Sequence, residues 1–161
     1  MNQTLSTLLI IGLFATEGQA VEAGQADAAA QDYSRLPVQQ AVLYSPTWQA
    51  LQRFPALYPL SAAMKHVEGC ATVEYVVTPQ NEVADLKLIA ATDKRFAVEA
   101  VKVVKKWPWS NLTKGSISAA VKTQTRFEFC FDEPQQSCES KAKKSVCPGE
   151  DVIFSAAGRL N

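Results

Sequence analysis

Hydrophobic and polar residues alternate along residues 70–77, and a second apolar segment follows at residues 83–91. Alternation with a period of two is typical of β-strands, because successive side chains point to opposite faces of a sheet. The residues between the two segments read Thr-Pro-Gln-Asn-Glu, and Asn81 is the candidate for a left-handed backbone position. The pattern therefore predicts a β-hairpin.

After residue 91 the period changes to that of a helix. The apolar residues of this segment form one wide stripe: Phe96, Ala97, Ala100, Val101, Val103, Val104 and Trp107. Thr92 or Asp93 can cap the start, and Pro108 ends the helix because proline cannot continue the hydrogen-bond ladder.

A third strand is predicted at residues 119–131, where apolar and polar residues alternate again and end in an aromatic run. A short helix at residues 61–66 precedes the hairpin. The resulting order, helix then β-β-α-β, predicts an α+β fold. We expect a two-layer sandwich with a three-stranded antiparallel sheet, helices on one face and solvent on the other.

The first 20 residues are typical of a secretory signal peptide. Leu5 begins an apolar stretch that ends at Ala15, and small residues at Gly18 and Ala20 suit cleavage after residue 20. The stretch is much shorter than the ~20 residues that a membrane-spanning helix needs. We therefore predict an exported periplasmic protein with no stable membrane anchor, and a weak inner-membrane tether if the segment stays uncleaved. Residues 21–36 are expected to form a flexible leader.

Composition excludes several functions. The 16 basic and 16 acidic residues balance, so the chain lacks the basic excess that nucleic-acid binding requires. His66 is the only histidine, no glycine-rich phosphate loop occurs, and no carboxylate pair has an interpretable spacing. We expect no catalysis, no metal and no cofactor.

Four cysteines, Cys70, Cys130, Cys138 and Cys147, suit an exported protein with two disulfides. Three pairings are possible for four cysteines. No Cys-x-x-Cys occurs, so neither a redox motif nor a zinc site is indicated.

The order and spacing of several short motifs resemble the C-terminal domain of the TonB family. They are Tyr58-Pro59 with Ala62, Glu68-Gly69, Val73 and Val77, Pro79, Val83, Glu99-Ala100, Lys106-Trp107-x-Trp109 and Gly115. The resemblance covers about residues 55–131, within a predicted domain at 37–131 and followed by a disulfide-containing extension at 132–161. Family energy transducers carry a membrane anchor and a long proline-rich spacer, so this chain resembles a stand-alone TonB-type domain.

The resemblance implies the function and the site. It places the third strand at one edge of the sheet, where unpaired backbone groups can pair with an added peptide strand. The implied partner is a segment of an outer-membrane receptor or another envelope protein, in TonB-dependent transport. The implied contacts come from Lys122, Thr123, Gln124, Thr125, Arg126, Phe127 and Glu128. Alternatively, the 132–161 extension or a second copy covers this edge.

The implied strand order also places the start of the first strand beside the end of the third. On that basis Cys70 is expected to pair with Cys130, and Cys138 with Cys147. A second hypothesis for the function of the whole chain is a structural or dimerisation module of the cell envelope, without a receptor role.

Overall fold

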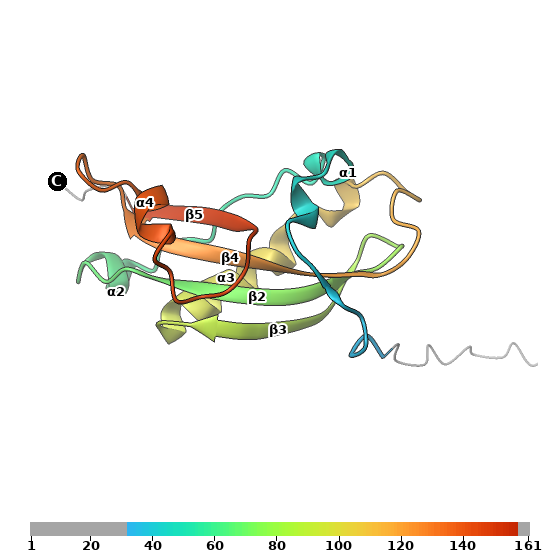
Figure 1. The fold of residues 1–161 in the computed structure, drawn as a ribbon, viewed down its shortest axis with the longest axis horizontal. Helices are drawn as coiled ribbons and strands as arrows, with labels where there is room; N and C mark the ends of the chain where they lie inside the picture. Colours follow the sequence, from blue (N-terminus) through green and yellow to red (C-terminus); the bar gives the residue numbers. More distant parts are fainter. Residues whose placement is uncertain (1–31, 158–161) are drawn as a thin grey trace, which may run out of the picture. The chain divides into compact units, whose positions relative to one another are not determined.

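In the computed structural model, which describes residues 32–157, the predicted hairpin is present as β2 (Gly69–Val77) and β3 (Val83–Ala91) (Figure 1). The turn between them places Asn81 at φ 63°, which confirms its predicted left-handed conformation. The predicted signal peptide and the leader up to residue 31 lie outside the described residues.

The predicted long helix is α3 (Lys94–Lys106), and it packs on one face of the hairpin. Asp93 caps it by accepting a hydrogen bond from the backbone N–H of Arg95 at 2.8 Å. Hydrogen bonds from the Arg95 side chain and backbone lower the pKa of Asp93 to about 2. Phe96, Ala100 and Val104 are buried against the sheet, as the hydrophobic stripe predicts.

The third predicted strand is β4 (Val121–Phe131), which pairs antiparallel with β2. A short helix, α2 (Leu60–Ala63), precedes the hairpin close to its predicted place. The predicted α+β class is therefore confirmed. The number of strands differs: the sheet has five strands instead of three, in the order β1-β4-β2-β3 with β5 also on β4.

The two additional strands come from segments that flank the predicted core. β1 (Val38–Gln39) begins a segment that we call the strap, residues 38–54, which contains two short helices, η1 (Val42–Tyr44) and α1 (Pro46–Gln49). After β4 the chain forms α4 (Cys138–Ala142) and then β5 (Val152–Ala157), a segment that we call the tail, residues 132–157. Between α3 and β4 lies one further short helix, η2 (Trp109–Asn111).

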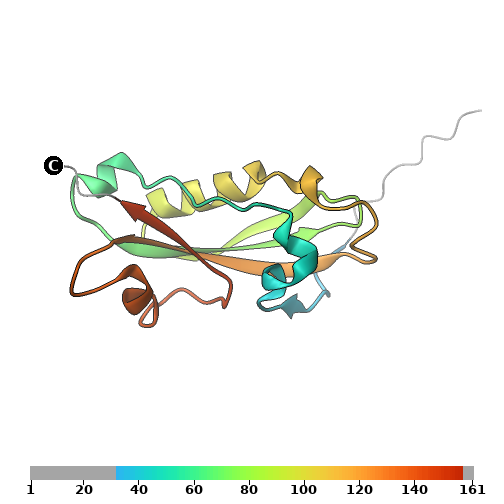
Figure 2. The same cartoon turned by 90° about the horizontal axis from the view of Figure 1, so that it is seen from above.

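The tail, which contains α4, lies on part of the sheet face opposite α3, as Figure 2 shows. The prediction that this face is open to solvent is wrong, because Thr72 and Val76 on β2 are fully buried. The hydroxyl of Thr72 donates to the carbonyl oxygen of Pro148 in the tail at 2.6 Å. The sheet therefore has cover on both faces.

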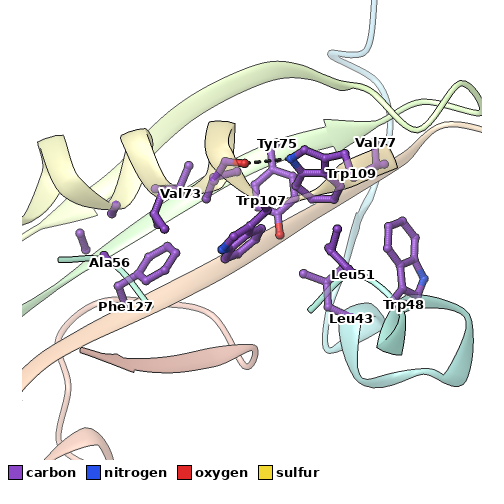
Figure 3. Packing of buried hydrophobic residues seen from close by; sticks show 14 of the residues in the cluster. Leu43, Trp48, Leu51, Ala56, Val73, Tyr75, Val77, Trp107, Trp109 and Phe127 are labelled. Atoms are coloured by element: carbon purple, nitrogen blue, oxygen red, sulfur yellow. Dashed lines mark hydrogen bonds between the residues drawn. The ribbon is translucent and has the colours of Figure 1, made fainter. Parts of the chain in front are cut away.

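The hydrophobic core lies between α3, the sheet and the strap (Figure 3). Trp107 and Trp109, which the sequence favours as core residues, are 2% and 8% exposed. Their indole N–H groups donate to the backbone carbonyls of Phe54 and Val104, so neither buried donor lacks a partner. No helix within residues 32–157 is long and apolar enough to cross a membrane.

Candidate functional site

All seven predicted contact residues lie on β4, and the structure brings them together along that strand. The pairing with β2 runs from Gly69 opposite Phe129 to Val77 opposite Val121, so one side of β4 is paired over residues 121–129. Thr123, Thr125 and Phe127 point to the α3 face and are buried. What β4 can offer to a partner is therefore its other side, which we call the β4 outer edge, residues 122–131.

The β4 outer edge is occupied by the chain itself, so its prediction as an open edge is wrong. β1 pairs parallel with it at Lys122 and Thr123. β5 pairs parallel with it from Arg126 opposite Val152 to Phe131 opposite Ala157. The alternative in which the extension covers this edge is what the structure shows.

β5 is a strand that the sequence pattern did not predict. The signal is a short run at residues 152–154, where β-branched and aromatic residues stand together after the turn-forming Pro148 and Gly149. The run lies in a polar, cysteine-containing segment, and its pairing is with a distant strand. Nothing local in the sequence fixes that pairing.

The disulfides join the tail to the sheet, in a different pairing from the predicted one. Cys70 pairs with Cys147, and Cys130 pairs with Cys138. The reason is the strand register: Cys70 lies opposite Glu128, two residues before Cys130. Residues offset in this way are about 7–8 Å apart, which is too far for the predicted Cys70–Cys130 bond.

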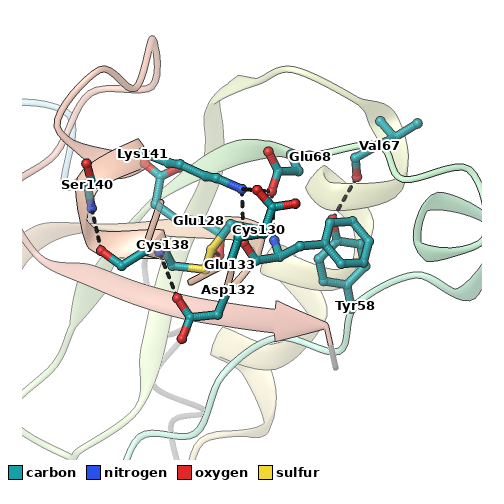
Figure 4. The surroundings of a disulfide bond; sticks show 12 residues. Tyr58, Val67, Glu68, Glu128, Cys130, Asp132, Glu133, Cys138, Ser140 and Lys141 are labelled. Carbon is teal, nitrogen blue, oxygen red and sulfur yellow. Dashed lines mark hydrogen bonds and ion pairs between the residues drawn. A yellow bond between two sulfur atoms is a disulfide. The ribbon is translucent and has the colours of Figure 1, made fainter. Parts of the chain in front are cut away.

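Polar contacts also attach the tail to the sheet. Lys141 of α4 donates to Glu68 Oε1 at 2.6 Å and to the carbonyl oxygen of Phe131 at 2.9 Å, beside the Cys130–Cys138 bond (Figure 4). The guanidinium of Arg126 donates to the carbonyl oxygen of Cys147 at 3.1 Å.

Glu128, one of the predicted contact residues, lies under the tail and is 7% exposed. Its carboxylate pairs with Arg126 Nε at 2.9 Å. Burial raises the pKa of Glu128, because desolvation disfavours the charged form more than Ser145 and Arg126 favour it. A partner at this edge would therefore contact the backbone here, while this carboxylate stays covered.

A buried carboxylate lies between the part of β4 that pairs with β1 and the part that pairs with β5. Asp151, immediately before β5, is fully buried, and its Oδ2 accepts a hydrogen bond from Thr125 Oγ1 at 2.6 Å. The same oxygen pairs with Arg53 of the strap. Because the Thr125 proton goes to Asp151, the hydroxyl of Tyr75 must donate in its 2.8 Å contact with Thr125.

Burial of Tyr75 raises the pKa of its phenol, so it remains a hydrogen-bond donor. The chain of contacts runs from the core residue Tyr75 to Thr125, then to Asp151 and Arg53. It joins the core of the sheet to both flanking segments.

The opposite edge of the sheet is β3, which pairs with β2 alone among the described strands. Its pairing with β2 shifts register twice, and Asp85 has φ 45°. Bulges of this kind interrupt the regular backbone pattern and protect an edge against an added strand. Lys87, in an ion pair with Asp85 at 2.9 Å, adds a charge to this edge.

Within residues 32–157 no three His, Cys, Asp or Glu side chains lie close enough to hold a metal ion. All four cysteines are in disulfides, so the described chain has no free thiol.

Three comparisons place this structure among known proteins. No curated protein matches the chain. A solution structure of the Pseudomonas aeruginosa TonB C-terminal domain is similar at 20% identity and a TM-score of 0.41, over 48% of this chain and 80% of that one. The family model described as "Gram-negative bacterial TonB protein C-terminal" matches residues 55–131, which include α2, β2, β3, α3 and β4. The strap, α4 and β5 lie outside the matched residues. Residues 55–131 therefore match the TonB C-terminal domain family, and the resemblance read from the sequence is confirmed over that range.

Proposed function

We propose that this protein is a periplasmic protein-binding module, associated with TonB-dependent transport, that adds a strand of an outer-membrane receptor or another envelope protein to β4. The incoming strand takes the place of β5 and contacts β4 mainly through the backbone, within the predicted residues 122–128 and on to Phe131. The observation that carries the proposal is β5 itself: a strand from outside the family domain pairs in regular register with the β4 outer edge. A partner strand in the same register would also run parallel to β4.

Replacement of β5 does not require a disulfide to break. The tail is fastened covalently at Cys138 and Cys147, and both lie before β5 in the chain. Residues 148–151 connect Cys147 to Val152, and an extended chain spans about 3.3–3.6 Å per residue. β5 and the adjacent Asp151 can therefore leave β4 while residues 132–147 stay attached.

The alternative edge is less suitable for a partner strand. The two register shifts in β3 interrupt the spacing of its outward N–H and C=O groups. The β4 outer edge has a continuous ladder of six residue pairs with β5. This contrast favours β4 as the binding strand.

The test is a titration of the isotopically labelled full chain with amino-terminal peptides of outer-membrane receptors, followed by NMR. We expect chemical-shift changes at residues 126–131, together with faster hydrogen exchange at residues 152–157 as β5 is displaced. Changes confined to β3, or none at saturating peptide, would refute the proposal.

A matched pair of variants sharpens this test. Arg126 N donates to Asp151 O at 2.8 Å, so in a parallel ladder the N–H of Ser155 points to β4 and the N–H of Ala156 points away. Ser155→Pro removes a ladder hydrogen bond and should tighten peptide binding by weakening β5. Ala156→Pro is the control, because it replaces an exposed residue whose N–H is not in the ladder, and its effect should be smaller.

The covered edge also favours a second candidate, a structural or dimerisation module of the envelope with no receptor role. In that case β5 is a permanent strand of the sheet. A stable dimer in sedimentation, combined with no response of residues 126–131 and 152–157 to saturating peptide, is the result that this candidate predicts.

A further inference from the structure

Asp151 is the one described carboxylate that is fully buried, and it lies where β5 begins. By the β5 register, it stands beside Thr125 on the β4 outer edge, one place before the Arg126–Val152 pair. A buried charge needs a partner, because desolvation otherwise costs several kcal/mol. Arg53 supplies that partner, and Thr125 adds a hydrogen bond to the same carboxylate oxygen.

The cation of this site is held in place by aromatic rings. The guanidinium carbon of Arg53 lies 5.5 Å from the ring centroid of Trp107 and 5.9 Å from that of Tyr44. Trp107 is buried in the core, and the hydroxyl of Tyr44 accepts a hydrogen bond from Val152 N at 3.0 Å. Arg53 is thus oriented by contacts that do not all depend on Asp151.

The hydroxyl donor of the site is also fixed by the core. Thr125 Oγ1 can give its single proton to a carboxylate because it accepts one from Tyr75. Both Thr125 and Tyr75 are fully buried on the sheet. Arg53, Thr125 and Tyr75 together form what we call the carboxylate subsite.

Asp151 does not use the subsite completely. Its Oδ2 takes both the Arg53 and the Thr125 contacts, while its Oδ1 is buried without a hydrogen-bond partner among the described residues. A buried oxygen without a partner weakens the hold of a group on its site. The chain's own carboxylate is therefore a replaceable occupant.

If β5 leaves β4, Asp151 leaves with it, and Arg53 and Thr125 lose their acceptor. An incoming strand that brings a carboxylate to the same place restores the ion pair and the hydrogen bond, and a neutral strand does not. We propose that the carboxylate subsite selects partner segments with an acidic residue beside Thr125, immediately before the residue that pairs with Arg126. This inference rests on the proposed function, because it specifies the segment that replaces β5.

The first experiment uses the full-length Asp151→Asn variant, in which the chain's own carboxylate is absent. Two eight-residue peptides are titrated by NMR: one with the sequence of residues 150–157, and one with Asn at the second position. A hydrogen bond to a charged group contributes enough for about a tenfold preference for the acidic peptide. With Arg53→Met added to Asp151→Asn, the two peptides should bind equally.

The second experiment does not depend on strand displacement. Asp151→Ala leaves space for a small carboxylate, so acetate should raise the melting temperature of this variant more than acetamide does at the same concentration and ionic strength. The double variant Arg53→Met/Asp151→Ala is the control, and its response to acetate should equal its response to acetamide.

Equal affinities of the two peptides for Asp151→Asn would overturn the inference. If neither peptide binds, the acetate experiment decides, and the absence of an acetate effect in Asp151→Ala would overturn the inference. If acetate and the acidic peptide behave as expected but no receptor peptide perturbs β4, the subsite stands and the proposed receptor function fails. The carboxylate subsite and the proposed receptor function can therefore be refuted independently of each other.

Discussion

At the scale of single residues, Gly69 shows why one motif position of the family resemblance needs its residue type. Gly69 opens β2, where the backbone passes close to the residues that begin α3. A Cβ built there would lie 2.0 Å from Thr92 Oγ1 and 3.0 Å from the ring of Phe96. Thr92 cannot simply turn away, because its hydroxyl accepts a hydrogen bond from Cys70 N at 2.9 Å.

Gly69→Ala should therefore destabilise the fold by about 1–3 kcal/mol, the usual cost of forcing extra volume into a packed site. Gly115→Ala is the matched control: it has φ 77° but no atom within 4 Å of a built Cβ, so only the left-handed conformation opposes it, at a cost of about 1–2 kcal/mol. Chemical denaturation of both variants measures how much free energy of unfolding each one loses. A Gly69→Ala protein as stable as wild type would contradict the close approach.

Residue positions on strong patterns were predictable, and positions set by distant contacts were not. The turn conformation of Asn81, the cap at Asp93 (one of two predicted candidates) and the burial of Trp107 follow from local sequence. The burial of Asp151 could not be predicted, because its partners Arg53 and Thr125 are far away in the chain and no periodicity joins them.

At the scale of elements, the strands and the helix with a long hydrophobic pattern were predictable, while the tail was not. β2 and α3 each have a regular apolar face, and burial of that face fixes their place in the fold. β5 has six residues and no strict alternation, so its pairing depends on the edge that β4 offers. The same tail changed the disulfide pairing, because Cys147 joins the start of β2 and Cys138 joins the end of β4, which lie at the same end of the β2–β4 pair.

The pairing in the structure predicts unequal effects of the two disulfides on stability. Cys70–Cys147 closes a loop with a separation of 77 residues, and Cys130–Cys138 closes one of 8. Chain-entropy reasoning gives about 4–5 kcal/mol for the longer loop and about 2–3 kcal/mol for the shorter one. Replacing Cys70 and Cys147 by Ser should therefore lower the free energy of unfolding more than replacing Cys130 and Cys138.

Denaturation of the two double variants measures this difference, and non-reducing peptide mapping of the wild-type protein checks the bonds themselves. The mapping should yield one peptide pair with Cys70 and Cys147, and one with Cys130 and Cys138. A Cys70–Cys130 peptide would restore the pairing first expected from the sequence and contradict the structure.

At the scale of the whole molecule, the flanking segments complete a sheet that the family domain alone leaves open. Residues 55–131 supply β2, β3, α3 and β4, but the strap and the tail cover the β4 outer edge and the sheet face opposite α3. On that face Val76 is fully buried, and Cys70 is 2% exposed. The strap and the tail therefore cover the surface that a partner or a second copy would otherwise cover.

A fragment of residues 55–131 with Cys70→Ser and Cys130→Ser should consequently self-associate. Without β1 and β5 its β4 outer edge presents unpaired backbone groups, and without the two flanking segments the sheet face opposite α3 loses cover. The control is a fragment of residues 32–157 with all four cysteines, in which both flanks are present. Sedimentation at several concentrations should show a concentration-dependent increase in mass for the shorter fragment and a constant mass for the longer one. If the shorter fragment is folded and monomeric at every concentration, covering the β4 outer edge is not what the strap and the tail contribute.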